Sequence, residues 1–122
     1  KNEHLPELMS AFASGHERKI NDLSRRLATW RAEDRRVTIW GAGSKGVTFL
    51  NLVPGADAIV YAVDVNPRKQ GNFIPGTGQQ IVTPDFLKGN PPDTVIVMNA
   101  VYEEEIRNNL AGMGVKAEII TA

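Results

Sequence analysis

The chain has 122 residues, of which 42% are hydrophobic and 23% are charged, a composition typical of one globular domain with its own core. Lys+Arg and Asp+Glu number 14 each, so the net charge gives no electrostatic reason to expect binding to nucleic acid or to an anionic membrane. Cysteine is absent, which excludes disulfides and thiolate catalysis and fits a cytoplasmic protein. No apolar run approaches the length of a membrane span.

The first third of the chain predicts one long amphipathic helix over residues 6–33. Mostly apolar residues recur every three or four positions, a spacing that places them on one face of a helix. They are Leu8, Met9, Phe12, His16, Ile20, Leu23, Leu27 and Trp30. We expect residues 1–35 to act as an inter-domain connector or interaction helix that covers a sheet edge, tethers a preceding domain or forms a homodimer. The expected packing residues are Met9, Phe12, Ile20, Leu23, Leu27 and Trp30. Since the chain begins with Lys1 rather than with Met, we expect it to be a piece of a longer protein.

A glycine-rich turn, residues 41–46 (GAGSKG), follows the β-favouring residues 37–40 (VTIW) and precedes a helix-compatible segment. This context is the one that a dinucleotide-binding strand–turn–helix unit requires. Gly41 allows the sharp turn, Gly43 allows an anion to approach the backbone, and Gly46 allows close packing of helix on strand. The free N–H groups of Ser44 and its neighbours at the helix start then favour a phosphate.

Residues 58–64 predict a second buried strand that ends at Asp64. An acidic residue at this position can accept a hydrogen bond from a ribose hydroxyl, or it can be a solvated or capping carboxylate. Residues 65–78 predict a long irregular loop, because glycines and prolines interrupt any helical period. We expect this loop to line the same crevice with donors that include Asn66, Lys69 and Thr77.

The remaining pattern predicts an α/β fold, a small Rossmann-like parallel sheet in residues 36–122 preceded by the long helix. Asn99 follows a strongly apolar strand and should lie at the ligand-binding edge of the sheet. The expected elements are strands at residues 80–83, 94–98 and 116–120, a helical turn at 84–87 and a helix at 102–113.

The sequence offers no catalytic constellation. The two histidines, His4 and His16, both fall in the first helix, and no cluster of metal ligands is present. The run Glu103, Glu104 and Glu105 opens a helix, where carboxylates offset the helix dipole. We therefore expect no catalytic residue and no metal site in this chain.

Three stretches together resemble the carboxy-terminal domain of bacterial S-adenosylmethionine-dependent C-methyltransferases that act on nucleotide-linked deoxysugars. They are residues 40–50 (WGAGSKGVTFL), 63–71 (VDVNPRKQG) with 73–78 (FIPGTG), and 97–99 (VMN) with Tyr102 and 105–106 (EI). The resemblance covers residues 37–115. One departure is Ala100, where the resemblance implies proline.

The resemblance implies that a missing, more amino-terminal methyltransferase domain binds S-adenosylmethionine, so that no cofactor belongs to this segment. It also implies that the glycine turn helps to hold a nucleotide-linked sugar rather than a redox cofactor. The expected substrate- or phosphate-binding residues are Gly41, Gly43, Ser44, Lys45, Gly46, Asp64, Asn66, Lys69, Thr77 and Asn99.

Another class of function fits the same glycine turn. The chain can be a small nucleotide-binding module for NAD or an acyl-CoA-type ligand, within a sensor or a dehydrogenase-like protein. A third possibility is a structural brace with an empty site, since a fold does not imply a function. The sequence upstream of Lys1 would discriminate best between these hypotheses.

Overall fold

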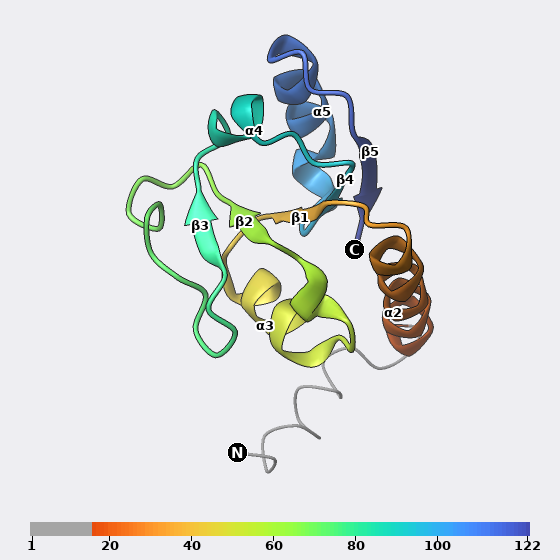
Figure 1. Cartoon of the computed structure of the whole chain (residues 1–122). Coiled ribbons are helices and arrows are strands. Elements are labelled where there is room, and N and C mark those ends of the chain that lie inside the picture. The colour runs from red at the N-terminus through yellow and green to blue at the C-terminus, as the bar shows by residue number, and fades with distance from the viewer. Residues whose placement is uncertain (1–15) are drawn as a thin grey trace.

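The structure is a computed structural model that describes residues 16–122, and its centre is a sheet of five parallel strands in the order β3-β2-β1-β4-β5 (Figure 1). The predicted parallel α/β architecture is thereby confirmed. The strands are β1 (Val37–Trp40), β2 (Tyr61–Val63), β3 (Gln80–Val82), β4 (Thr94–Val97) and β5 (Glu118–Thr121). The helices are α2 (His16–Ala32), α3 (Ser44–Leu52), α4 (Phe86–Gly89) and α5 (Glu103–Gly112), with 3₁₀ turns η2 (Ala56–Ala58) and η3 (Ala100–Tyr102).

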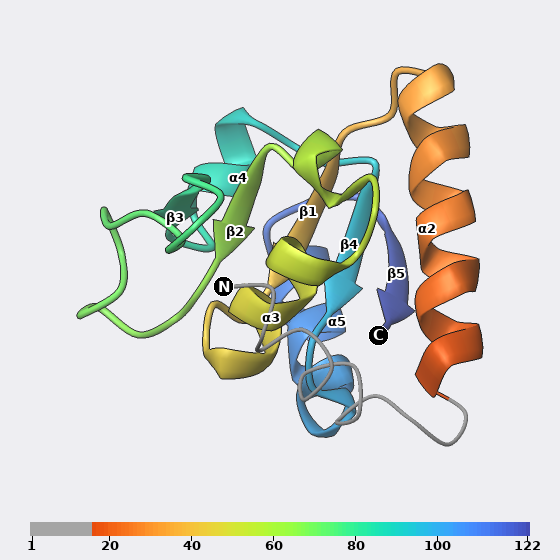
Figure 2. The same cartoon turned by 90° about the horizontal axis from the view of Figure 1, so that it is seen from below.

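Helices cover both faces of the sheet, which explains why every residue of the central strands β1 and β4 is buried. Helices α2 and α3 lie on one face, where Ile39 and Ile96 contribute to a shared core (Figure 2). Helices α4 and α5 cover the other face, which buries Val95 and Val97. Thr38 is also fully buried, and its hydroxyl donates to the carbonyl oxygen of Tyr61 at 2.6 Å.

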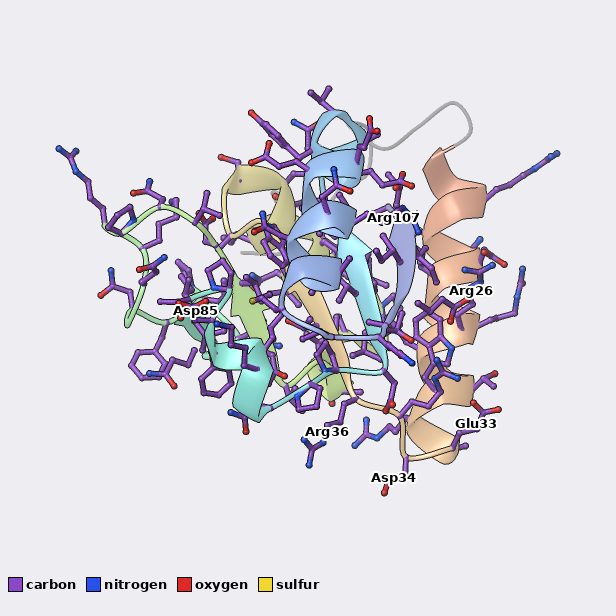
Figure 3. The ribbon with its side chains drawn as sticks, turned by 90° about the horizontal axis from the view of Figure 1, so that it is seen from above. Arg26, Glu33, Asp34, Arg36, Asp85 and Arg107 are labelled. Carbon is purple, nitrogen blue, oxygen red and sulfur yellow. The ribbon has the colours of Figure 1, made fainter. Side chains whose placement is uncertain are left out.

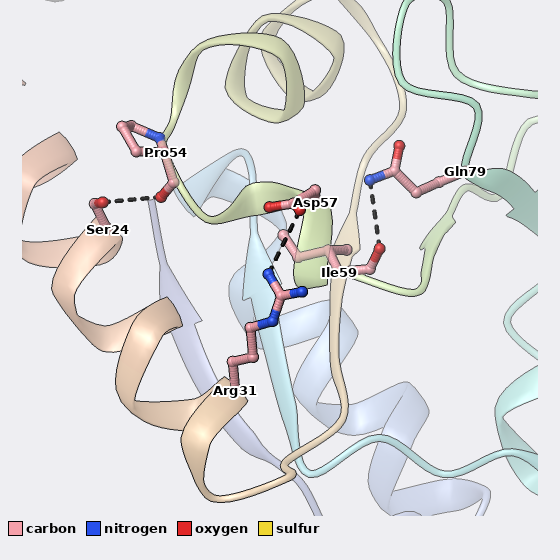
Figure 4. A network of polar contacts seen from close by, with 6 residues as sticks. All are labelled: Ser24, Arg31, Pro54, Asp57, Ile59 and Gln79. Atoms are coloured by element: carbon pink, nitrogen blue, oxygen red, sulfur yellow. Dashed lines mark hydrogen bonds and ion pairs between the residues drawn. The ribbon is translucent and has the colours of Figure 1, made fainter.

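Helix α2 packs on the domain through the apolar stripe that its sequence predicts. Ile20, Leu23, Leu27 and Trp30 are all buried in the core that also contains α3. At its edges, Ser24 Oγ donates to the carbonyl oxygen of Pro54 at 2.8 Å and Arg31 pairs with Asp57 at 3.4 Å (Figure 4). The other expected packing residues, Met9 and Phe12, lie outside the described residues, as does the predicted helical segment 6–15.

A homodimer through this helix stays a prediction. Because Ile20, Leu23, Leu27 and Trp30 face the chain's own core, a second copy would have to contact other residues of the helix.

Element boundaries differ from expectation where a short turn competes with the regular element. The second strand starts at Tyr61 rather than at residue 58, because Gly55 (φ +91°) leads into the 3₁₀ turn η2. Helix α5 starts at Glu103, because the Asn99 side chain accepts from the Val101 N–H and initiates η3. The last strand lies one to two residues later than predicted and pairs in register with β4, Thr94 opposite Glu118.

Charged side chains occupy the outer surface. Arg26, Glu33, Asp34, Arg36, Asp85 and Arg107 are all exposed (Figure 3). Exposed pairs such as Arg26–Asp22, at 3.4 Å, contribute little to stability because water screens them. Within residues 16–122, no helix combines the length and the apolar character needed to cross a membrane.

Replacing Leu27 by alanine tests the docking of α2. Leu27 is 1% exposed, so we expect the change to lower the free energy of unfolding by about 2–5 kcal/mol through lost burial and a cavity. The matched control is Arg25→Ala on the exposed face of the same helix, which should change stability by about 0.5 kcal/mol or less. Urea denaturation measures both, and equal midpoints would show that α2 is not docked.

Candidate functional site

A cleft of about 440 Å³ opens at the carboxyl ends of the central strands. It lies where the strand order reverses, with β2 on one side of β1 and β4 on the other. Open parallel sheets bind ligands at such a switch point. The lining residues are Trp40, Gly41, Gly43, Ser44, Lys45, Gly46, Asp64, Val65, Val97, Met98, Asn99, Tyr102, Glu105, Ile106 and Asn109.

The glycine turn holds α3 close to the strands. Gly41 has φ +119°, which favours glycine, and its N–H donates to the carbonyl oxygen of Val63 at 2.7 Å. A Cβ atom on Gly46 would collide with the carbonyl oxygen of Gly41, so only glycine permits this approach. The turning role of Gly41 and the packing role of Gly46 are therefore confirmed, while their part in binding stays a prediction.

The start of α3 presents unused hydrogen-bond donors to the cleft. Gly43 is the N-cap and supplies no capping side chain, and the first turn of the helix contains no acidic residue. In the part of the chain that the structure describes, the N–H groups of residues 43–46 have no acceptor. A Cβ atom on Gly43 would meet nothing within 4 Å. Backbone donors at a helix start and the helix dipole are features that favour an anion.

Asp64 joins the two loops on this side of the cleft. Its Oδ2 accepts from the Ala42 N–H and its Oδ1 from the Asn66 N–H, both at 2.8 Å. Its backbone carbonyl oxygen accepts from Gln70 Nε2 at 2.9 Å. The carboxylate thus ties the glycine turn to the loop that follows β2.

Three more of the predicted site residues line the cleft. Ser44 and Lys45 lie exposed in the first turn of α3, and Asn99 follows β4. The Asn99 side-chain oxygen accepts from the Val101 N–H at 3.1 Å, which leaves its amide donors free for a ligand.

Only the start of the loop after β2, at Val65, lines the cleft, and the expected Asn66, Lys69 and Thr77 are absent from the lining residues that the structure describes. The loop folds back along β3, where the Gly71 N–H donates to the carbonyl oxygen of Ile81 at 2.8 Å. This fold-back carries Thr77 to the amino ends of the strands, away from the carboxyl ends where the cleft opens.

The contacts of the neighbouring residues show this placement. Gln79 Nε2 donates to the carbonyl oxygen of Ile59, ahead of β2 (Figure 4), and Asn51 Nδ2 donates to Pro75 beside the end of α3. The expectation that Thr77 shares a crevice with the glycine turn was therefore wrong.

Helix α5 provides a wall that sequence reasoning missed. Tyr102, Glu105 and Asn109 line the cleft, and their spacing places them on one side of the helix. The apolar period of this segment identified only its buried residues, Ile106 and Leu110. The sequence pattern that could have predicted this wall is the row of polar residues next to the apolar positions of the helix.

The charges of the lining are mixed. Among the described residues that line it, Lys45 is the cationic side chain, and Asp64 and Glu105 are the carboxylates. Glu103 lies on another side of α5, where hydrogen bonds from Thr121 and Arg107 lower its pKa. Among the described residues, no group of three or more His, Cys, Asp or Glu side chains could hold a metal ion.

The different surroundings of two glycines in the same turn give a stability test. We expect Gly46→Ala to lower the free energy of unfolding by about 1–3 kcal/mol, because its Cβ forces α3 away from the turn. Gly43→Ala, whose Cβ meets open space, should change it by about 0.5 kcal/mol or less. Thermal denaturation compares the two variants, and equal losses would contradict the close approach.

Comparisons with known proteins place the chain among relatives. No curated protein matches it. The solved structure of a Rex-family repressor is similar over 100% of this chain and 69% of that chain, with TM-score 0.55 and 17% identity, a likeness that shows the fold alone. A family model described as C-methyltransferase C-terminal domain matches residues 3–121. The chain therefore belongs to the C-methyltransferase C-terminal domain family.

Proposed function

We propose that the chain helps a S-adenosylmethionine-dependent C-methyltransferase to bind a nucleotide-linked sugar, with the diphosphate at the glycine turn. The observation that carries this proposal is the set of N–H groups at residues 43–46, which have no acceptor within residues 16–122 and lie at the cleft, at the start of α3. Backbone donors at a helix start suit phosphate oxygens. Lys45 adds a cationic side chain beside them.

The size of the cleft fits this ligand. Ligand pockets have volumes of about 300–1,000 Å³, and the cleft measures about 440 Å³. Its apolar parts, Val65 and Met98 among them, can cover a nucleoside, and Glu105 and Asn109 on α5 add polar side chains to the lining.

The methyl donor and the chemistry belong, in this proposal, to a methyltransferase domain that precedes the segment. The cleft supports a binding role because the carboxylate of Asp64 already accepts from two backbone N–H groups and so is poorly suited to act as a general base. The preceding domain is then the partner, and S-adenosylmethionine is the cofactor of the whole enzyme.

The alternative is a module for NAD or an acyl-CoA-type ligand. The observation that favours it is the combination of a glycine turn with an acidic residue after β2, both at the cleft. In dinucleotide-binding folds, an acidic residue at this position accepts from a ribose hydroxyl.

An amide-shift titration separates the two functions. Uridine or thymidine diphosphate should shift the amides of residues 43–46 and Asn99, while the amide of Thr77 stays still. We expect millimolar affinity, on the order of 4 kcal/mol of binding free energy, because part of the site belongs to the preceding domain. Gly43→Val should abolish the shifts, since its side chain fills the open space at the turn.

The matched control is Gly89→Val, which also meets open space but lies at the end of α4, away from the cleft. It should bind like the wild type. Shifts with NAD alone, measured in parallel, would replace the nucleotide-sugar proposal by the dinucleotide module. Shifts with none of these ligands would contradict both functions.

Binding of S-adenosylmethionine gives an independent test. Because the proposal places the methyl donor in the preceding domain, we expect no heat of binding to this chain at micromolar concentrations. Isothermal calorimetry with the whole chain measures this, and a micromolar affinity for the donor would overturn the assignment.

A further inference from the structure

The two carboxylates of the cleft differ in their hydrogen bonding to the rest of the protein. Asp64 is half-buried, and each of its oxygens accepts from a backbone N–H at 2.8 Å. Glu105 is exposed on α5 and, among the described residues, has no hydrogen-bond or ion-pair partner. One carboxylate is engaged by the protein, while the other is available to a ligand.

The bonds of Asp64 reach both loops that border the anion-binding turn. Ala42, one of its donors, directly precedes Gly43, the N-cap of α3. Removing the carboxylate would leave the Ala42 N–H without its acceptor and free the turn to move. The orientation of the N–H groups at residues 43–46 thus depends on a bond that Asp64 makes within the protein.

Glu105 has neighbours that complete a binding surface. Tyr102 and Asn109 lie three residues before and four residues after it, on the same side of α5. An ionised carboxylate only accepts hydrogen bonds and repels phosphate. Glu105 therefore suits neutral donors, such as the hydroxyl and N–H groups of a nucleoside, and directs the phosphates toward the glycine turn.

We propose that Asp64 is a positioning residue that holds the glycine turn, and that Glu105 is the specificity-determining acceptor for the nucleoside part of the ligand. This inference rests on the proposed function for its ligand. It reverses the assignment that the dinucleotide fold suggests, in which the acidic residue after β2 binds the ribose.

The test compares inorganic pyrophosphate, which has no nucleoside, with uridine diphosphate. Three variants of the whole chain are titrated by amide shifts, Asp64→Asn, Glu105→Gln and the matched control Glu104→Gln. Glu104 also lies in the first turn of α5 but does not line the cleft. Amide shifts and hydrogen exchange of Ala42 and Asn66 are recorded before any ligand is added.

Asp64→Asn should weaken both probes by the same factor, about tenfold, because the turn that binds phosphate is disturbed. Without ligand, it should also shift Ala42, Asn66 and residues 43–46 and speed exchange at Ala42 and Asn66. Glu105→Gln should weaken uridine diphosphate about tenfold and leave pyrophosphate unchanged or tighter, because a charged acceptor is lost and a repulsive charge is removed. Glu104→Gln should change neither probe.

Two results would overturn the inference. Asp64 contacts the nucleoside if Asp64→Asn weakens uridine diphosphate but spares pyrophosphate, and Glu105 has no selective role if Glu105→Gln affects both probes equally. If the wild type binds neither probe, the proposed function fails and the assignment of Glu105 fails with it. The ligand-free shifts and exchange rates then still decide whether Asp64 holds the turn.

Discussion

The close approach of α3 to the turn after β1 is the contact on which the rest of the cleft depends. At Gly46 the helix backbone lies so near the carbonyl oxygen of Gly41 that no side chain fits between them. This approach sets the start of α3 directly beyond the carboxyl end of β1, at the centre of the sheet. The N–H groups at the start of the helix consequently lie at the switch point of the sheet, where neighbouring loops diverge.

The burial of β1 makes this arrangement rigid. Each residue of β1 is buried, and the strand pairs with β2 on one side and β4 on the other. Apolar contacts on both faces hold the strand in place, so the turn that follows it has a fixed starting point. Asp64 then holds the far side of the turn through Ala42.

Patterns local in the chain were predictable, whereas contacts between distant segments were not. The strand at residues 37–40 has the predicted bounds, since β-favouring residues end directly at a glycine turn. Thr77 was misplaced, because no local pattern reveals that its loop folds back along β3. The bond from Ala42 to Asp64 joins segments 22 residues apart and depends on strand pairing. Glu105 was assigned to the helix dipole, and only the packing of α5 shows that it faces the cleft.

The two walls of the cleft differ in how they can change during evolution. The wall at the glycine turn is built mainly from backbone N–H groups, so what it offers an anion depends on keeping the turn and its glycines in place. The wall on α5 is built from the exposed side chains of Tyr102, Glu105 and Asn109, which carry none of the helix's core packing. Their substitution costs little stability. In the proposed function, phosphate binding therefore depends on the backbone of the glycine turn, while the choice of nucleoside depends on the side chains of this one helix.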